Sequence, residues 1–493
     1  MELKSLLPER WDNEADVVIV GYGAAGAATA ITVHDAGGVA LILEKAPEGE
    51  AGGNSRVAGQ FWLNLAPIDR AITYFDAMAG PYTVSPEVVR VWAEEMGKNS
   101  DWVRSIGGEP VEMRTGPEGA AFPELPGADC VHLCHVGPQH GYEGLWKVLK
   151  AAVDKRHVQI LYATPGRELI QHGLTKEILG VRAEREGKPI NIKAKRAVVL
   201  TCGGFENNQE MVRDFLPGLP YCYPLGTPYN TGDGIKMAMT VGADLWHMNN
   251  IAGPWYSLKV PEFPSIFEIA PLSWAAESRG GLILVGPDGK RFIDEKKRQT
   301  HGKVMVSGQW TQDWTPYPMF MIFDDVLLSA GPLYNKNLYH GWNEILNVYP
   351  WSADNSVELA KGWIKKAETI AELAGKLGLS PTILEDTVNR WNAYYRDEKD
   401  LDFGRTKMFS PIKGPPFYAM EMSPFFVNTQ GGPRRNARGQ IVRPDGSPIS
   451  RLYSAGELGS VYSFLYNAGG NLGECMVFGR ISGRNALAER AWR

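Results

Sequence analysis

The feature that most constrains the fold is a segment near the start of the chain, which reads DVVIVGYGAAGAATAITVHDAGGVALILE at residues 16–44. An apolar run of β-formers leads into a glycine turn, an alanine-rich stretch follows, and a second apolar run ends on Glu44. This order is typical of a strand, a turn, a helix and a second strand that is followed by an acid. The segment therefore predicts that the chain begins with a Rossmann-like α/β unit, which binds a dinucleotide.

The residue types in this unit each have a physical role. Gly21 permits the tight turn, Gly23 lets the backbone approach a pyrophosphate, and Gly26 lets the helix lie close to the strand. The N-terminus of the helix attracts the phosphates, and Glu44 is placed to accept hydrogen bonds from a ribose. A turn without a ligand is the alternative, and the motif alone does not distinguish NAD from FAD. The cofactor-binding candidates of this unit are Gly21, Gly23, Ala24, Ala25, Gly26, Glu44 and Lys45.

Length and composition bound the class of protein. At 493 residues the chain is long enough for two or three domains, and 44% hydrophobic with 22% charged residues is typical of a soluble globular protein. A net charge of −5 argues against nucleic acid as a partner. The first residues lack the apolar core of about 7 to 15 residues that a signal peptide needs, and no window reaches about 18 uninterrupted apolar residues. We therefore expect a cytoplasmic protein without a membrane span.

The cysteines and histidines do not predict a metal site. The five cysteines are scattered and include no CxxC pair. His132, His135 and His140 share a Gly/Pro-rich loop, but that loop offers no second acid or cysteine at ligand spacing, so polar or substrate-facing histidines are favoured. Without a metal or an iron–sulfur cluster, electrons must pass to or from a diffusible partner.

Two later segments are typical of turns that lie beside a cofactor. Asn54 and Ser55 sit in a Gly-rich loop, which either contacts the cofactor or forms a plain surface turn. The apolar run 197–201 leads into Gly203 and Gly204, where we expect the backbone to pass beside the cofactor.

Changes in residue composition and pattern along the chain predict where its domains begin and end. Asp233 precedes a short predicted helix, and whether it caps that helix or holds the cofactor stays open. From the composition we expect a first part of the nucleotide-binding domain at 1–262, an inserted cap domain at 263–411 and a C-terminal part at 412–493. Among the elements that the patterns predict are a hairpin at 281–293 and helices at 85–106, 357–374, 381–397 and 474–489.

Ordered motifs along nearly the whole chain carry a family resemblance. They are DVVIVGYGAAGAATA, GGNS, LTCGGF, NTGDGIKMA, GKRFIDE, TQGG, SAGELG and NAGGN. This set resembles the flavoprotein superfamily of fumarate reductase and succinate dehydrogenase subunits, and it is most similar to the 3-ketosteroid dehydrogenase branch. The resemblance implies non-covalent FAD rather than NAD. It also implies an α/β fold, in which a Rossmann-like FAD-binding domain carries an inserted α+β cap domain for the substrate.

The resemblance implies roles for individual residues as well. Asn54 and Ser55 would line the phosphates and the flavin, and Glu457 would hold the ribityl chain. The turn before the last helix would point the helix N-terminus at the flavin, where it stabilises the negative charge of the reduced ring. The other cofactor-binding residues that the resemblance implies are Gly203, Gly204, Gly469, Gly470, Asn471 and Leu472.

Departures from the fumarate reductase pattern bear on the substrate. Those enzymes hold a dicarboxylate with two arginines and a histidine, since carboxylates need bidentate cationic partners. Asn428 and Asn467 stand at two of these positions, and Gln299, next to Arg298, stands at the third. A C4 dicarboxylate is therefore disfavoured as the substrate.

The ketosteroid dehydrogenases instead present a tyrosine that is followed four residues later by a glycine, and this chain has Tyr466 and Gly470. Removing a hydride from the carbon β to a ketone requires that the α proton leave and that negative charge gather on the carbonyl oxygen. A phenol O–H and a backbone N–H stabilise that enolate. The sequence does not decide which residue is the base that removes the α proton. Tyr462 and His301 are the candidates, and ordinary packing is the alternative role for both.

These residues predict an FAD-dependent dehydrogenase that introduces a C=C bond beside the ketone of a cyclic substrate. The substrate would be a 3-ketosteroid or a smaller cyclohexanone-type ring, and the electrons would pass to an unknown diffusible acceptor. An ene-reductase of the same fold, acting on an enone or an α,β-unsaturated acid, is the alternative. The third hypothesis is a protein that binds flavin but has no catalytic activity.

Overall fold

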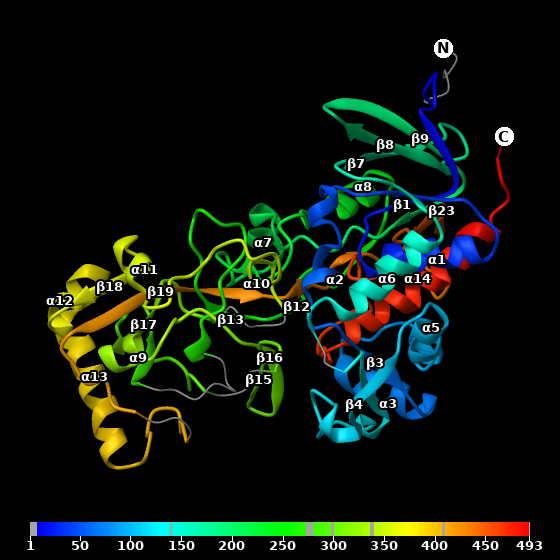
Figure 1. Ribbon diagram of the computed structural model, residues 1–493. Coiled ribbons are helices and arrows are strands. Elements are labelled where there is room, and N and C mark those ends of the chain that lie inside the picture. The colour runs from blue at the N-terminus through cyan, green and yellow to red at the C-terminus, as the bar shows by residue number, and fades with distance from the viewer. Residues whose placement is uncertain are drawn as a thin grey trace.

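The structure is a computed structural model that describes residues 7–138, 141–272, 280–296, 300–335, 340–406 and 410–492. Figure 1 shows two lobes side by side, with both ends of the chain at the same lobe. The long strand β19 (Phe417–Phe426) runs from the other lobe, the cap, back toward the first. This arrangement confirms the predicted fold class, a Rossmann-like domain with a second, α+β domain.

A largely parallel sheet organises the first lobe. β1 (Asn13–Val20) lies between β2 (Ala40–Leu43) and β9 (Lys188–Leu200), and it pairs with both in parallel. The order across the sheet is β22-β23-β9-β1-β2-β6, with β8 and β7 attached beyond β9. Residues 17–20 are buried because a parallel sheet is covered on both faces. The remaining strands are β6 (Gln159–Leu161), β7 (Gly166–Gln171), β8 (Ile178–Arg185), β22 (Gln440–Val442) and β23 (Pro448–Ser454).

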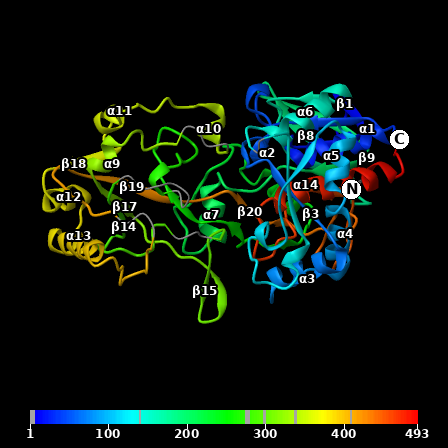
Figure 2. The ribbon, with the colours of Figure 1, turned by 60° about the horizontal axis from the view of Figure 1, so that its bottom comes forward.

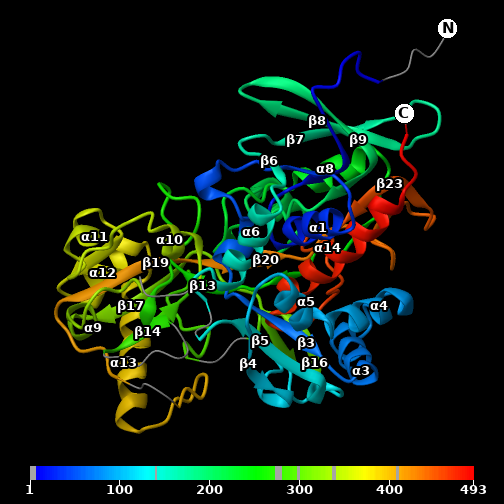
Figure 3. The ribbon, with the colours of Figure 1, turned by 45° about the vertical axis from the view of Figure 1, so that its right-hand side comes forward.

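Two helices rich in small residues cover one face of this sheet. α1 (Ala24–Asp35) and α14 (Gly470–Ala488) lie alongside each other, as Figure 3 shows. A Cβ added at Gly479 would stand 2.7 Å from the Cβ of Ala28, so the glycine is needed for the helices to approach this closely. Close packing fixes where α14 begins, and its first residue is four positions earlier than the predicted start at 474.

A small three-stranded sheet, β3-β5-β4, lies beneath the helices of the first lobe. The prediction of one helix at 85–106 is wrong, because the segment forms two helices that are separated at Gly97. Gly97 and Lys98 turn the chain between the helices, so the apolar side chains of the two helices face the core independently. The elements here are β3 (Phe61–Leu65), α3 (Ile68–Ala79), α4 (Pro86–Met96), α5 (Asn99–Ser105), β4 (Pro110–Thr115), β5 (Val131–Val136) and α6 (Gly144–Lys155).

The cap is built on a second sheet with the order β10-β19-β17-β14, to which β13 and β18 also pair through β19. Its strands come from three stretches of the chain, since β10 and β13 precede residue 263 and the whole of β19 follows residue 411. β14 pairs along its length with β17, and only an isolated bridge joins Val285 to Arg291 within the predicted hairpin. The strands are β10 (Tyr223–Pro224), β13 (Trp255–Ser257), β14 (Leu282–Val285), β17 (Met319–Asp324) and β18 (Ile364–Ala367).

The predicted helix at 357–374 is also wrong. Gly362 has a φ of 76°, a backbone conformation that favours glycine and ends the helical turn α11 (Ser356–Ala360). The chain then forms β18 before a new helix, α12 (Ile370–Leu377), begins with Thr369 as its cap. The next helix, α13 (Pro381–Arg396), agrees with the prediction to within one residue.

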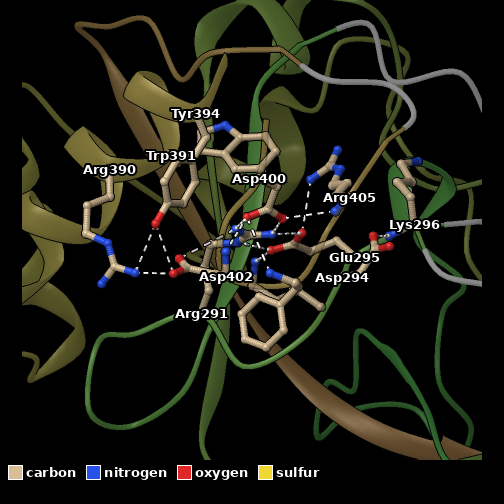
Figure 4. A network of polar contacts seen from close by, with 12 residues as sticks. Arg291, Asp294, Glu295, Lys296, Arg390, Trp391, Tyr394, Asp400, Asp402 and Arg405 are labelled. Atoms are coloured by element: carbon tan, nitrogen blue, oxygen red, sulfur yellow. Dashed lines mark hydrogen bonds and ion pairs between the residues drawn. The ribbon is translucent and has the colours of Figure 1, made fainter. Parts of the chain in front are cut away.

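A buried ion-pair network, shown in Figure 4, fixes the GKRFIDE motif inside the cap. The guanidinium of Arg291 contacts Glu295 at 2.9 Å and Asp400 at 3.0 Å, and Arg405 contacts Glu295 at 3.1 Å. Both guanidiniums lie over the ring of Trp391, at 4.6 and 4.7 Å from its centroid. Because each charge has a partner, burial is tolerated, and the segment that leads toward the site is held firmly.

Figure 2 shows the hairpin of β15 (Lys303–Val306) and β16 (Gln309–Gln312) projecting from between the lobes. In the described part of the chain, no helix combines the length and the apolar character needed to cross a membrane. Within the same ranges, no group of three or more histidine, cysteine or acidic side chains comes together as a metal site. His132 pairs with Glu112 at 2.7 Å, and His140 lies outside the described residues.

Candidate active site

The glycine turn after β1 leaves no space for side chains. Gly21 has a φ of 109°, and a Cβ there would stand 2.4 Å from the carbonyl oxygen of Thr201. A Cβ at Gly26 would stand 2.1 Å from the carbonyl oxygen of Gly21. The first N–H of α1, that of Ala24, donates to the hydroxyl of Ser55 at 2.9 Å, which brings the GGNS loop against the helix N-terminus. This backbone cradle has the form of a phosphate-binding turn.

The acid at the end of β2 is buried and held by the backbone. The carboxylate of Glu44 accepts hydrogen bonds from the N–H of Tyr22 at 2.7 Å and of Ala46 at 2.6 Å. Burial raises the pKa of Glu44, and the two N–H groups oppose that shift. The backbone contacts orient the carboxylate in the groove, where a ribose hydroxyl would meet it.

Asp233 is the first residue of α8 (Asp233–Thr240), whose cap is Gly232. Its side chain forms an ion pair with Lys45 at 2.8 Å, and the hydroxyl of Thr231 also donates to it, at 3.1 Å. The side chain therefore does not cap the helix. Both members of the ion pair line the same groove as the glycine turn.

The groove gathers most of the predicted cofactor-binding residues of the chain. Gly203 lines it, and a Cβ at that position would stand 2.7 Å from the amide group of Asn230. Gly204 lies just behind, where a Cβ would meet the hydroxyl of Thr429 at 2.0 Å. The predicted residues that line this groove are Gly21, Gly23, Ala24, Ala25, Glu44, Lys45, Asn54, Ser55, Gly203, Asp233 and Glu457.

Two features of the groove test whether it fits FAD. The side-chain nitrogen of Asn230 and one carboxyl oxygen of Glu457 are buried, and neither has a hydrogen-bond partner among the described protein atoms. Buried polar groups of this kind are normally paired, so they suit a ligand that carries hydroxyl and phosphate groups. Asn54, Ser55, Glu457 and Cys475 line both this groove and a second cavity, which allows one extended cofactor to occupy both. The residues present therefore fit FAD.

A pair of buried carboxyls stands at the junction of the two spaces. Glu206 and Glu457 both accept hydrogen bonds from the side-chain nitrogen of Asn54, each at 3.3 Å. Burial and the neighbouring charge of Glu206 raise the pKa of Glu457 well above its ordinary value. Because two like charges so close together repel each other, the neutral form of Glu457 is favoured, and in that form its carboxyl can donate as well as accept.

The second cavity has a volume of about 250 Å³ and lies where the first lobe meets the cap. Its walls come from α2 (Gly53–Val57) and the loop after it, from the residues that follow β10 and β19, and from the turn at the start of α14. The lining residues that the sequence predicted are Asn54, Ser55, His301, Glu457, Tyr466, Gly469, Asn471 and Leu472.

Tyr466 presents its phenol in this cavity. The N–H of Asn471 approaches the phenol oxygen at 3.5 Å, while the N–H of Gly470 donates to the carbonyl of Asn467 at 2.9 Å. The amide beside the phenol is therefore that of Asn471, one residue after the expected Gly470. Burial raises the pKa of Tyr466, so the group stays a phenol O–H donor throughout the neutral range.

Tyr462, the other tyrosine of this turn, has a different environment. Its ring is 1% exposed and packs against Phe75, Trp92 and Tyr466. A Cβ at Gly470 would stand 2.3 Å from its phenol oxygen, so the glycine is needed for the two to pack together. Among the described residues that line the cavity, Tyr462 is absent. This placement favours the packing role for Tyr462.

His301 stands against Tyr466 inside the cavity. The two rings are perpendicular, with centroids 4.8 Å apart, and the imidazole also meets Trp255. His301 has a φ of 52°, and its carbonyl accepts a hydrogen bond from the N–H of Gly253 at 3.1 Å. The next residue, Gly302, is so close to Gly253 that a Cβ would stand 1.7 Å from the Gly253 carbonyl oxygen. The backbone therefore holds the histidine in one position.

The arginines that hold a dicarboxylate have no counterpart in the cavity lining, which includes no arginine or lysine within the described ranges. Asn428 lines it instead, and its side-chain nitrogen donates to the carbonyl of Thr429. Asn467 faces away and accepts from the phenol of Tyr74 at 2.7 Å. Arg298 and Gln299 lie outside the described residues. The rest of the lining is mainly apolar, and Val57, Phe61 and Leu225 are examples.

One lining residue that the sequence did not indicate is His340. Its Nε2 contacts the carboxylate of Glu268 at 3.2 Å, and the backbone N–H of Glu268 donates to Glu344 at 3.3 Å. The histidine and its carboxylate are 72 positions apart and carry no motif, so only the fold brings them together.

The glycine turn, the dinucleotide groove and the adjoining cavity define a flavoprotein oxidoreductase. The family model described as FAD binding domain matches residues 16–472, and the chain belongs to this family. The chain is thus an FAD-dependent oxidoreductase of a family whose members act on CH–CH groups, which confirms the expected cofactor and enzyme class.

Known proteins of similar sequence include enzymes of both reaction directions. Digoxin reductase of Eggerthella lenta is 28% identical, with 98% of this chain and 88% of that protein covered. The 3-oxosteroid 1-dehydrogenase of Mycolicibacterium smegmatis is 27% identical, with 97% and 98% covered. In fold, the chain is similar to the 3-ketosteroid delta1-dehydrogenase of Sterolibacterium denitrificans, with a TM-score of 0.75, 21% identity and 97% and 100% coverage.

Proposed function

We propose that this protein is a dehydrogenase that introduces a C=C bond beside the ketone of a cyclic, mostly apolar substrate. The observation that carries the proposal is Tyr466, a phenol that is kept protonated by burial and lines the cavity beside the α14 N-terminus. FAD, when bound, would supply the acceptor for the two electrons. In the reaction the α C–H bond gives up a proton, the β hydrogen leaves with its electron pair, and the C=C bond forms between the two carbons.

The phenol and the helix N-terminus would stabilise the charge that gathers on the ketone oxygen. The Asn471 N–H contacts the phenol oxygen, which leaves the O–H hydrogen of Tyr466 for the substrate. The partial positive charge at the start of the 19-residue helix α14 acts on the same place. A preformed donor of this kind is worth about a hundredfold to a thousandfold in rate.

His301 is the group that we propose takes the α proton. Its imidazole meets the Tyr466 ring, and the α carbon of a ketone is bonded directly to the carbon that carries the oxygen. A base that serves this carbon must therefore lie close to the group that holds the oxygen. The fixed backbone of the His301–Gly302 turn limits the motion of the ring, as general-base catalysis requires.

The lining of the cavity supports a ketone over a dicarboxylate. Within the described ranges the lining includes no lysine or arginine, and its walls are apolar on the side of Val57 and Leu225. A dicarboxylate placed there would bury charge without a bidentate partner. A cyclic ketone would instead bury carbon against carbon.

Product analysis tests the proposal. Purified holoenzyme with an artificial electron acceptor and a saturated 3-ketosteroid, or a substituted cyclohexanone, should form the corresponding enone. No enone from any ketone of either size, with FAD fully bound, would refute the proposed activity.

An ene-reductase that acts on an enone or an unsaturated acid is the second candidate. Sequence relatives named digoxin reductase and urocanate reductase, at 28% and 27% identity, support this direction. The same residues serve both directions, since the group that accepts a proton in one donates it in the other. Steady-state assays with an oxidant and with a reduced donor, run on matched ketone and enone, separate the two.

A further inference from the structure

Lys303, the first residue of β15, is a buried lysine that lies two positions after His301 in the chain. The residue is 3% exposed, and its amino group lies 5.2 Å from the centroid of the Phe464 ring. Burial lowers the pKa of Lys303 to about 7, and no acid within the described ranges forms an ion pair with it. Because burying an amino group costs free energy unless its N–H groups are satisfied, the partners of Lys303 indicate what it does.

The partners of Lys303 are two side-chain amides. Its amino group donates to Oδ1 of Asn250 at 3.0 Å and to Oε1 of Gln312 at 2.6 Å. Amide oxygens only accept, so the lysine fixes the oxygen of each amide toward itself and turns each amide nitrogen away. An amino group keeps two N–H groups when it is neutral, so both bonds form in either protonation state. One side chain therefore orients two amides.

The amide of Gln312 closes the turn that carries His301. Its nitrogen donates to the carbonyl of Gly302 at 2.8 Å and to the carbonyl of Gly253 at 2.7 Å. The N–H of Gly253 in turn donates to the carbonyl of His301 at 3.1 Å. The bond from Lys303 to the amide oxygen is what directs the Gln312 nitrogen at these two carbonyls.

The amide of Asn250 connects Lys303 to the segment that leads to Tyr466. Its nitrogen donates to the carbonyl of Tyr462 at 2.9 Å. That segment is anchored independently, because the carboxylate of Glu474 accepts a hydrogen bond from the N–H of Val461 at 2.9 Å. Lys303 therefore ties the turn that carries His301 to a part of the protein that is already fixed.

The hairpin itself offers the turn little support. β15 and β16 form a two-stranded sheet of their own, which projects from between the lobes (Figure 2). A two-stranded hairpin is at best marginally stable by itself, so side-chain anchors decide where its ends lie. Trp310 in β16 packs against Phe122, with ring centroids 5.1 Å apart, and Lys303 is the buried anchor at the end nearest His301.

We propose that Lys303 is a positioning residue that fixes the imidazole of His301 relative to the phenol of Tyr466. It acts through the amides of Gln312 and Asn250, which hold the backbone of the two segments. This inference rests on the proposed function, in which His301 takes the α proton and Tyr466 binds the ketone oxygen. A displacement of about 1 Å between reacting groups costs about a hundredfold in rate, so the tie matters to the reaction.

The rate of flavin reduction by a saturating cyclic ketone, measured anaerobically, tests the inference. Lys303→Met keeps an unbranched side chain but removes the donor that orients both amides. We expect the rate to fall about tenfold to a hundredfold with FAD still bound. The matched control is Lys259→Met, because Lys259 is a half-buried lysine that also lies over an aromatic ring, at 5.4 Å, and donates to the carbonyl of Val260 at 2.7 Å. The control should stay within a few-fold of the wild type.

A double-mutant cycle with His301→Ala separates positioning from a general structural role. If Lys303 acts through His301, Lys303→Met should cost less than about twofold once the imidazole is gone, since residues that act as a unit are not additive. Disturbed packing, or a direct effect of the amino group on the ketone oxygen, would cost the same factor in both backgrounds. Gln312→Leu is the second variant, because Gln312 is half-buried and its loss leaves Lys303 in place. It should show the same pattern.

Two results would overturn the inference. They are a Lys303→Met enzyme that holds FAD and reduces it at the wild-type rate, and an equal loss of rate with and without His301. If Lys303→Met does not retain FAD, Gln312→Leu decides by the same two criteria.

Failure of the proposed function looks different. The wild type would then reduce no flavin with any ketone, whereas its chemically reduced form would be reoxidised by an enone. The same cycle is then measured on the rate of reoxidation, because the group that accepts a proton in one direction donates it in the other. Additive losses from Lys303→Met and His301→Ala in that assay would overturn the inference as well.

Discussion

Replacing Tyr466 by Phe isolates the contribution of one oxygen atom. The ring is 8% exposed and lies 4.8 Å from His301 and 5.2 Å from Tyr462, and phenylalanine preserves both contacts. The substitution loses the contact with the Asn471 N–H, which at 3.5 Å is at the limit of a hydrogen bond. Stability should therefore change little. The rate should fall about a hundredfold to a thousandfold, or ~2.7–4 kcal/mol, as for the loss of one oxyanion donor.

The assay is the rate of flavin reduction after anaerobic mixing of the oxidised enzyme with a saturating cyclic ketone. This rate contains the bond-breaking steps and excludes reoxidation. The internal control is Tyr462→Phe, which removes the same atom four positions away from a ring that packs outside the cavity. We expect the control to stay within a few-fold of the wild type. A Tyr466→Phe enzyme that reduces its flavin at the wild-type rate, or a control that is equally impaired, would refute the assignment.

Three further predictions follow from backbone packing and buried charge. Gly302→Ala should displace His301 and lower flavin reduction at least tenfold with FAD still bound; an unchanged rate would show that the turn does not position the base. Arg291→Met should lower the free energy of unfolding by about 3–5 kcal/mol, because it leaves the buried carboxylate of Asp400 without its guanidinium partner, and chemical denaturation measures this. The raised pKa of Glu457 means that folding favours its neutral form. Its contribution to the free energy of unfolding should therefore be complete below the ordinary carboxyl pKa and should decline as the pH rises toward the raised pKa. Glu206→Gln should flatten that decline in denaturation midpoints taken over a pH series, and an unaltered slope would show that the charge of Glu206 does not raise the pKa of Glu457.

The parts of the fold that the sequence predicted are those with local signals. The β1–α1–β2 unit was predictable because apolar period, glycine turn and terminal acid all fall within residues 16–44. The helix breaks at Gly97 and Gly362 were not predictable from the sequence. The apolar pattern continues across each glycine, and only tertiary packing decides where the helix ends. The strand β18 forms where a partner, β19, is available to pair with it.

The candidate site also contains residues that sequence motifs indicate and residues that only the folded structure reveals. Tyr466 and the cofactor-binding residues belong to motifs, and the fold brings most of them to two adjoining spaces. Whether Gly470 or Asn471 places its N–H beside the phenol depends on which of the two N–H groups already donates within the turn. The N–H of Gly470 does so, and the sequence spacing cannot reveal this. The pairing of His340 with Glu268 left no trace in the sequence, since the two residues are far apart in the chain and meet only when the cap itself folds.

The central claim is that a cyclic ketone is oxidised at this site, and one anaerobic experiment tests it most directly. Oxidised enzyme is mixed with excess ketone in the absence of any other acceptor, and the flavin spectrum and the ketone-derived products are both followed. The account predicts loss of the oxidised flavin spectrum together with one enone formed per flavin reduced. A flavin that stays oxidised with every ketone, in an enzyme whose chemically reduced form is reoxidised by an enone or an unsaturated acid, would contradict it.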